Sequence, residues 1–463
     1  MQRPVDGLEA GAGSSRELLK LAAPLVLSNA FWTLQMTIDR VMLSRQNSDA
    51  VGAAMTAAVL YWAPLALLQF TAAYATTFVA QYVGAGRRER VGPSVWQAIH
   101  FSVLTGIAFL AVLPFIGSLV ALGEHSPEVQ ALETTFLKCL CFATLPILLI
   151  AAVNSFFAGR GDSWPVLLVN AVGAVVTVLL DYAWIYGNWG FPAWGIAGAG
   201  WATVAGSWAS AAVALALFLR PKFRKQYETL SGMRFDRPLF LRLMRFGLPS
   251  GMQYCMEALS FAIFLTLVGQ LGTVELTATS IAFTINMTAL VPMVGLAQAV
   301  SVLVGQRLGQ DRADFAARTT RRGVIWCLLY TLVNAGMFAF YPGPLLALFR
   351  DDDATRWASV VLIVPTLLQF VAVYCLFEGV SVILSSALRG AGDTRFVSAV
   401  TLVFSWTLMV LPTFVARKAG WGLYPVWIFA TSYLVVLSFV FVWRFRQGKW
   451  KSMRVIEAAP PIA

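Results

Sequence analysis

The chain has 463 residues, of which 58% are hydrophobic and only 12% are charged, and its mean hydropathy is +0.71. A soluble protein of this length carries about twice that charged fraction, so the composition excludes a soluble domain and indicates an integral membrane protein. The formal net charge of +11 would suggest a nucleic-acid partner only if the basic residues gathered on one face. They fall instead in alternate loops between apolar runs, and we expect no nucleic-acid partner.

The first apolar run extends from about residue 18 to residue 44, which is too long for the core of a signal peptide and predicts a first spanning helix. Later runs are also long enough to cross about 30 Å of hydrocarbon at about 1.5 Å per residue. Helices are expected because barrel strands need only about ten alternating residues. The twelve predicted spans are 18–44, 50–82, 93–122, 128–157, 164–187, 195–219, 239–270, 275–307, 315–349, 355–387, 395–418 and 422–445.

Most of the 34 Lys and Arg residues lie near the two ends of the chain and in every second loop. Examples are residues 87–90, 220–225, 318–322 and 444–454. Cytoplasmic loops carry such an excess, so we expect both termini in the cytoplasm and a multi-pass protein of the cell (inner) membrane, in contact with lipids.

The two halves of the chain resemble each other. A constant offset aligns Pro24 with Pro249, Gln81 with Gln306 and Gly84 with Gly309, and a slightly larger one aligns residues 158–162 with 389–393. Six spans in each half give both halves the same orientation, which predicts an all-α fold of two six-helix lobes related by a pseudo-two-fold axis along the membrane normal. The expected domains are an N-terminal lobe (1–220), a basic cytoplasmic linker (221–237) and a C-terminal lobe with its tail (238–463).

Small residues and tryptophans give local predictions. Gly198, Ala202, Gly206 and Ser210 recur every four residues and predict a face for close helix packing. Several tryptophans near span ends are interpreted as interfacial anchors: Trp189, Trp194, Trp421 and Trp450.

The sequence offers few residues that could bind a metal ion or a cofactor. The five cysteines lie in apolar segments without a C-x-x-C spacing, and the only histidines are His100 and His125. We therefore expect no zinc or haem site, no cofactor, and no intramembrane enzyme, which would need a His, Ser or metal constellation at depth.

Four acids lie well inside predicted spans: Asp39, Asp181, Glu257 and Glu378. An acid at this depth is costly unless it faces a cavity and finds a partner. Asp39 and Asp181 lie in the outer parts of spans 1 and 5, which both run outward, so they could share one site. Glu257 and Glu378 lie near the middle of spans 7 and 10 and could share another. The alternative is structural: each acid could lock two helices by hydrogen bonds, and Asp39 could pair with Arg40.

A carboxylate in a partly dry cavity favours holding a proton, Na⁺ or an organic cation. Antiport requires at least that two such species compete for one negative charge, so that one must leave before the other binds. No phosphate-binding loop of the Walker type is present, so the energy would come from an ion gradient or a partner protein.

Several stretches together resemble the multidrug and toxic compound extrusion (MATE) family, in its prokaryotic NorM and DinF branches, over nearly the whole chain. They are residues 18–24 followed by 37–42, residues 190–200, residues 246–249 with Met256-Glu257, residues 304–309, and Leu376-Phe-Glu378 followed by 388–393.

The resemblance implies efflux of amphipathic, mainly cationic organic compounds in exchange for Na⁺ or H⁺ by alternating access. Glu257 and Glu378 fall on the family's cation-site acids, where Na⁺ would be the only metal ion. Asp39 falls on the first-lobe acid implicated in coupling or substrate binding. Asp181 matches the helix-5 acid of the DinF-like branch, although Thr177 stands where that branch commonly has Asn.

A lipid-linked saccharide flippase of the same wider superfamily is the alternative. Such a flippase tends to need cations in its cavity for pyrophosphate, whereas the span interiors here are acidic and offer only Lys138 and Arg40. We expect a monomer that handles small-molecule organic cations.

Overall fold

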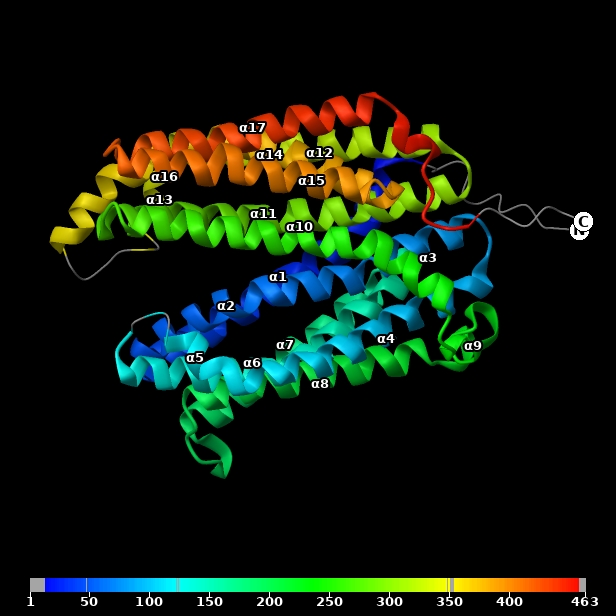
Figure 1. Ribbon diagram of the computed structural model, residues 1–463, viewed down its shortest axis with the longest axis horizontal. Helices are drawn as coiled ribbons and strands as arrows, with labels where there is room; N and C mark the ends of the chain where they lie inside the picture. Colours follow the sequence, from blue (N-terminus) through cyan, green and yellow to red (C-terminus); the bar gives the residue numbers. More distant parts are fainter. Residues whose placement is uncertain are drawn as a thin grey trace, which may run out of the picture. The chain divides into compact units, whose positions relative to one another are not determined.

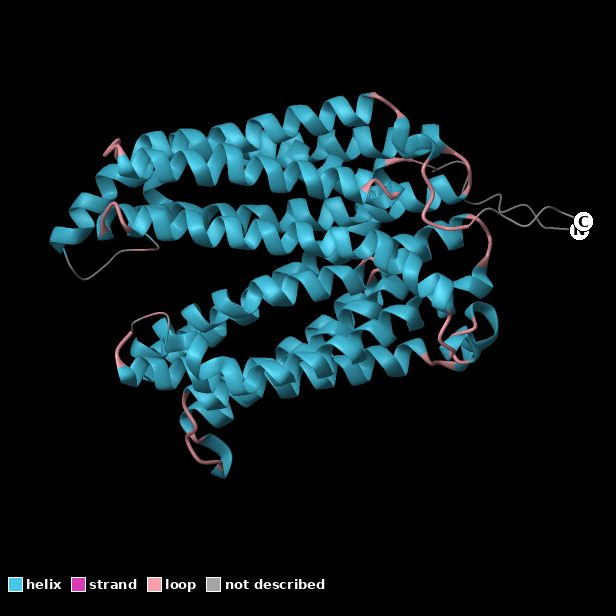
Figure 2. Cartoon of the chain, viewed as in Figure 1, coloured by secondary structure: helices cyan, strands magenta, loops and turns pink. Residues whose placement is uncertain are grey.

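The computed structural model describes residues 13–46, 48–121, 123, 125–347, 349 and 354–457. In this part of the chain all regular structure is helical (Figure 2). Twelve helical segments among the described residues are long and apolar enough to cross a membrane, as predicted, and the chain is a multi-pass membrane protein. They are Ser15–Gln46, Ala50–Gly84, Arg88–Ala121, Pro127–Gly159, Trp164–Tyr186, Ile196–Phe218, Arg237–Gly269, Thr273–Gly309, Ala313–Phe340, Trp357–Ala391, Thr394–Lys418 and Leu423–Arg446.

The boundaries of the observed spans agree with those predicted from the sequence to within a few residues, with one larger difference. The ninth span was expected to reach residue 349, but α12 (Ala313–Phe340) ends earlier and a short α13 (Pro342–Ala347) follows. Tyr341 precedes a proline, which disfavours helical backbone at that residue, and its φ of −130° ends the helix. The predicted cytoplasmic placement of both termini concerns residues 1–12 and 458–463, which lie outside the described residues.

The chain packs into two compact units. Unit 1 comprises the described residues up to Val26, Met256–Leu308 and Arg312–Met453. Unit 2 comprises Leu27–Cys255, Gly309–Asp311 and the described residues from Arg454 onward. The predicted linker 221–237 lies inside unit 2, and the division of the chain into lobes at this linker stays a prediction.

Two long helices are shared between the units. In α1 (Ser15–Gln46) the change of unit follows Pro24 by two residues, and in α10 (Arg237–Gly269) it comes six residues after Pro249. A proline inside a helix removes one backbone hydrogen bond and crowds the preceding turn, which bends the helix. The repeat-related prolines therefore mark the parts of α1 and α10 where the chain passes from one unit to the other.

Unit 2 is organised around α6 (Pro127–Gly159), which packs against α2 (Ser48–Ala73), α3 (Ala75–Gly84), α4 (Val91–Phe109) and α8 (Ile196–Phe218). Its apolar core includes Tyr61, Leu65, Ile116, Leu137 and Leu148. The remaining helices of unit 2 (Figure 1) are α5 (Ile116–Ala121), α7 (Trp164–Tyr186) and α9 (Pro221–Tyr227), with short 3₁₀-helices η1 (Arg88–Arg90), η2 (Leu110–Phe115), η3 (Asn188–Gly190) and η4 (Ser231–Met233).

Helices α7 and α8 approach closely through small residues. A Cβ added to Gly206 would stand 2.0 Å from Oγ1 of Thr177 and 2.9 Å from the carbonyl oxygen of Gly173. Oγ of Ser210 donates a hydrogen bond to the carbonyl of Val169 at 2.8 Å. Small side chains let two backbones pack at this range and let a hydroxyl bond across helices. The predicted packing face is confirmed.

Unit 1 is organised around α14 (Ala354–Ala391), which packs against α12, α15 (Thr394–Phe404) and α17 (Leu423–Arg446). It also contains α11 (Thr273–Gly309), α16 (Leu411–Lys418) and η6 (Lys449–Ser452). A π-helical turn, η5 (Ser405–Val410), joins α15 to α16. Pro412 lies just after this turn and lacks the amide that an α-helix would use there, which accounts for the local change of hydrogen bonding.

The internal repeat is visible in the packing. In unit 2, a Cβ on Gly159 would stand 2.8 Å from the carbonyl oxygen of Thr76, and in unit 1, a Cβ on Gly390 would stand 2.4 Å from that of Ser301. The sequence alignment of the halves pairs Gly159 with Gly390 and Thr76 with Ser301. Each unit thus contains the same glycine-mediated contact, α3 with α6 in one and α11 with α14 in the other.

The tryptophan predictions have a mixed outcome. Trp189, Trp194 and Trp421 are exposed, as expected of interfacial anchors. The prediction for Trp450 is wrong, because this side chain is fully buried, stacks on Phe445 and donates its indole N–H to the Phe445 carbonyl at 2.9 Å.

Candidate functional site

Helices α1 and α7 bring two pairs of polar side chains together within unit 2. Nδ2 of Asn170 donates to Oγ of Ser28 at 2.5 Å. Three turns further along both helices, from 28 to 39 and from 170 to 181, the carboxyl groups of Asp39 and Asp181 lie within interaction range of each other. The equal spacing means that the helices run in parallel, with about 16 Å between the two levels. The structure thus brings Asp39 and Asp181 together.

The Asp181 carboxyl group is fully buried, and neither of its oxygens accepts a hydrogen bond from a donor in the described residues. The same holds for Oδ1 of the half-buried Asp39. Two ionised carboxylates are acceptors only, so they can bond to each other only if one carries a proton or if a cation lies between them. The two carboxyl groups therefore need a proton or a cation between them, and no described side chain donates a hydrogen bond to Asp181.

Two further features surround the Asp39–Asp181 pair. Thr177, one turn before Asp181 on α7, is buried with its hydroxyl against Gly206 of α8. Toward the other polar level, Asn154 of α6 donates to Oδ1 of Asn170 at 3.5 Å. The contact of Thr177 with Gly206 holds α7 against α8. The hydrogen bond between Asn154 and Asn170 adds a side chain of α6 to the polar cluster of the unit.

Glu257 and Glu378 come together in unit 1. Oε2 of Glu378, on α14, accepts a hydrogen bond from Nδ2 of Asn286, on α11, at 3.3 Å. Glu257, on α10, lies within electrostatic range of Glu378, and both lie within range of Tyr433 on α17. Four helices of unit 1 therefore converge on these two half-buried carboxyl groups.

A buried aromatic group lies next to the glutamates. The fully buried Trp427 stacks on Phe283, with 5.0 Å between ring centroids, and donates its indole N–H to Oγ1 of Thr279 at 3.2 Å. Tyr374, one turn before Glu378, lies 6.5 Å from the same indole, centroid to centroid. Such an apolar wall lowers the local dielectric constant and strengthens every charge interaction of the neighbouring acids.

Of the two structural alternatives for Asp39, the ion pair with Arg40 is not formed among the described residues, whereas its interaction with Asp181 joins α1 to α7 and is compatible with a helix-locking role. Arg40 acts on Asp39 electrostatically, but its side chain is exposed and makes no ion pair with Asp39 among the described residues. For Glu378, the bond from Asn286 does join two helices, so a helix-locking role and a cation-binding role are both compatible with that contact.

Sequence reasoning missed Asn286 and Tyr433, because it searched the spans for charged residues only. A buried amide inside an apolar run carries the same signal as an acid, though a weaker one, and would have identified Asn286. Tyr433 offered no such signal, since tyrosine is common in spanning helices.

Comparisons with known proteins agree with this fold. The NorM protein of Xylella fastidiosa (strain Temecula1), called a probable multidrug resistance protein, is 27% identical over 435 residues, which cover 93% of this chain and 91% of the relative. The NorM of Pseudomonas aeruginosa, with the same description, is 28% identical over 451 residues, covering 96% and 91%. A solved structure described as the outward-facing conformation of a multidrug resistance MATE family transporter superimposes with a TM-score of 0.87 at 19% identity, covering 98% of this chain and 100% of that one.

The sequence profile of the MatE family matches residues 24–183 and 249–415. The first segment contains Asp39 and Asp181, and the second contains Glu257 and Glu378, so each matched segment carries one acidic pair. With more than half of its residues matched in this way, the chain belongs to the MatE family.

Proposed function

We propose that this protein is a cation-coupled antiporter that exports amphipathic, mainly cationic organic compounds by alternating access. Membership of the MatE family and the names of the NorM relatives support efflux. The observation that carries the proposal is the buried Asp181 carboxyl group, which contacts Asp39 and has no donor among the described residues. An antiporter needs such a site, where one cation must leave before another binds.

In this proposal Glu257 and Glu378 bind the coupling ion, Na⁺ or H⁺. Two carboxylates beside the Asn286 amide offer the oxygen ligands that a hard cation prefers, and protonation of the same oxygens would displace it. Their aromatic surroundings limit access of water, so the site would respond strongly to the presence of one charge.

Asp39 and Asp181 then form the proton or substrate site of the other unit, with Thr177 supporting α7 beside it. An organic cation carries the single positive charge that this pair requires. Because the aspartates lie in unit 2 and the glutamates in unit 1, the exported compound and the coupling ion have separate acidic pairs available to them.

The direct test is transport of ethidium in everted membrane vesicles under an imposed Na⁺ or H⁺ gradient. We expect one gradient to drive ethidium uptake, and Glu257→Gln or Glu378→Gln to abolish the coupled component. Glu128→Gln, an exposed acid at the start of α6, is the matched control and should behave as wild type. Uptake driven by neither gradient would reject antiport, and normal coupling in both glutamine variants would remove Glu257 and Glu378 from the site.

The proposal includes a topology: a monomer in the inner membrane with both termini in the cytoplasm. The excess of Lys and Arg in alternate loops supports it. Membrane-impermeant maleimide should label Arg88→Cys only from the cytoplasmic side and Glu128→Cys only from the outer side. The opposite labelling would reverse the topology.

A further inference from the structure

The last described residues attach the carboxyl-terminal segment to unit 2. Helix α17 and η6 belong to unit 1, whereas the chain from Arg454 onward belongs to unit 2. The buried Val455 donates its backbone N–H to Oε1 of the buried Gln81 at 2.8 Å. Two residues later, Glu457 lies among arginines of the η1 region and of α10.

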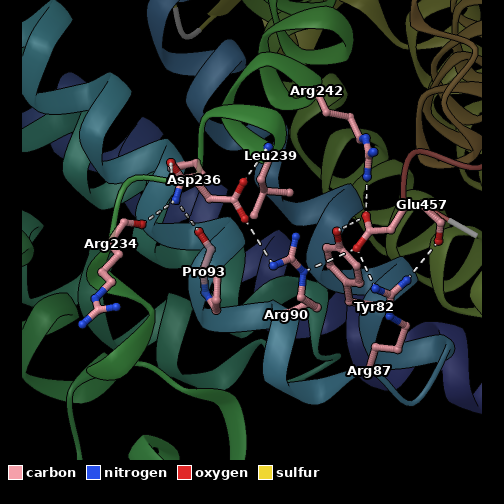
Figure 3. A network of polar contacts seen from close by, with 10 residues as sticks. Tyr82, Arg87, Arg90, Pro93, Arg234, Asp236, Leu239, Arg242 and Glu457 are labelled. Carbon is pink, nitrogen blue, oxygen red and sulfur yellow. Dashed lines mark hydrogen bonds and ion pairs between the residues drawn. The ribbon is translucent and has the colours of Figure 1, made fainter. Parts of the chain in front are cut away.

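Glu457 is held by three guanidinium groups and a phenol (Figure 3). Its carboxylate accepts hydrogen bonds from Nη2 of Arg87 at 2.6 Å and from the hydroxyl of Tyr82 at 2.7 Å. Nε of Arg90 lies 3.4 Å away, and Nη1 of Arg242 also donates to the carboxylate. We call Arg87, Arg90, Arg242 and the Tyr82 hydroxyl the arginine cradle.

The charge of the arginine cradle exceeds that of its occupant. Three guanidinium groups face Glu457, and among the described residues Asp236, 3.2 Å from Arg90, is the only other acid in contact with them. The arginine side chains are only 20% to 32% exposed. If the carboxylate left, three partly buried positive charges would face one acid, and their repulsion would favour binding of another anion.

The chemistry of the arginine cradle suits a phosphate ester as well as a carboxylate. Guanidinium groups present paired N–H donors that fit phosphate oxygens, and several of them can surround one phosphate. Arg87 and Arg90 lie in a basic loop that the positive-inside pattern assigns to the cytoplasm, and Arg242 lies in the first turns of α10. The lipids of that leaflet carry anionic headgroups, which attract basic residues close to the membrane.

We call residues 454–457 the tail, and its Glu457 carboxylate does not change its protonation near neutral pH. Burial alone would raise the pKa of Glu457, but the hydrogen bond from Tyr82, the backbone and the charges of Arg87 and Arg90 lower it to about 2. Glu457 therefore stays ionised at physiological pH, and release of the tail requires a competing anion rather than a proton.

We infer that the arginine cradle is a binding site for the phosphate of an anionic phospholipid, and that Glu457 is a built-in competitor for it. The tail is joined to η6 by only a few residues, so its carboxylate is present at high effective concentration and keeps the site closed until anionic lipid is abundant. The inference rests on the predicted cytoplasmic face and not on the proposed transport activity, so the two can fail independently.

The test uses the full-length protein in nanodiscs of phosphatidylcholine with increasing phosphatidylglycerol. Retained phosphatidylglycerol is counted by native mass spectrometry, and tail release is followed by trypsin cleavage after Arg454, whose bond to the buried Val455 should be protected while the tail is docked. Glu457→Gln and Arg242→Gln both weaken docking of the tail, but only the first leaves all three guanidinium groups in place. The controls are Glu89→Gln and Arg88→Gln, exposed neighbours outside the arginine cradle.

We expect phosphatidylglycerol to accelerate cleavage of the wild type. Glu457→Gln should be cleaved rapidly in any lipid and should reach half occupancy at a phosphatidylglycerol fraction lower by about tenfold, because a charge-assisted competitor is gone. Arg242→Gln should also be cleaved rapidly but should lose the lipid, whereas Arg242→Lys, which keeps the charge, should retain part of it. Both controls should match the wild type.

Two results would overturn the inference. One is equal retention of phosphatidylglycerol by Glu457→Gln and Glu89→Gln. The other is release of the wild-type tail in pure phosphatidylcholine by millimolar glycerol 1-phosphate or inorganic phosphate, which would assign the arginine cradle to a soluble phosphate.

Discussion

Asp181→Asn is the most informative single change, because it alters the charge of the aspartate pair and little else. Two ionised carboxylates about 4 Å apart repel each other by about 4 kcal/mol at an effective dielectric constant of 20. This energy corresponds to a factor of about 10³ in favour of a state that holds one proton or one cation. In the variant, the amide at position 181 can donate to Asp39, and the requirement for a positive charge disappears.

The assay is gradient-driven ethidium uptake in everted vesicles, normalised to the amount of folded protein. Access of water to the half-buried Asp39 reduces the electrostatic factor, so we expect the coupled rate to fall by about tenfold to a hundredfold. The thermal unfolding midpoint should remain close to that of the wild type, since no donor to Asp181 is lost. Glu128→Gln controls for a carboxyl-to-amide change outside the site.

An Asp181→Asn variant with normal coupled transport would refute the reasoning, because the pair would then have no need of a cation. A variant that lost transport together with its thermal stability would instead indicate that Asp181 locks α7 to α1. A second variant, Asp39→Asn, should show the same loss of coupled transport, with a thermal unfolding midpoint similar to that of the wild type.

Three further predictions concern packing, the glutamate pair and the tail. Gly206→Ala should reduce the free energy of unfolding by about 1–3 kcal/mol, because the new methyl group would meet a backbone oxygen at 2.9 Å. The control Gly336→Ala, with nothing within 4 Å of its added Cβ, should leave the thermal unfolding midpoint unchanged. Equal effects of the two substitutions would contradict the packing argument. Asn286→Leu removes a donor to Glu378 and should shift the coupling-ion concentration for half-maximal exchange about fivefold, as a change of about 1 kcal/mol implies. The concentration should rise if the ion is Na⁺, because the carboxylate loses the amide that positions it, and fall if the ion is H⁺, because the carboxylate holds a proton more tightly without the donor. An unchanged concentration would exclude that contact from the ion site. Glu457 has a pKa of about 2 against an ordinary value of 4.5, so its stabilising effect is complete above pH 4.5 and is lost as the pH falls toward 2. The thermal midpoints of the wild type and Glu457→Gln should therefore converge across this range, and a constant difference would argue against an ionised Glu457.

Span number, span positions and the acidic pairs could be predicted because each depends on local composition. Apolar run length fixes where a helix crosses, and a carboxyl group inside such a run is costly enough to indicate a site. The small residues at Gly206 and Ser210 likewise predicted a close contact from their spacing alone. Features that depend on how the chain folds back on itself could not be predicted. Trp450 is buried against Phe445 at the end of α17, and Glu457 contacts arginines more than two hundred residues away in the sequence.

The repeat was also only partly informative. It correctly related Gly159 to Gly390, because both must allow a backbone to approach. It said little about the acids, since Trp32 occupies the position in the first half that Glu257 occupies in the second. The repeat therefore relates the glycine contacts of the halves and not their acidic pairs.

The sharing of α1 between the units has a consequence for biosynthesis. The first described residues, up to Val26, leave the ribosome before any of their partners in unit 1, which begin at Met256. During translation this stretch must wait for its unit 1 partners until Met256 and the residues after it have been made. A nascent chain interrupted in the linker would leave its opening segment without the rest of unit 1.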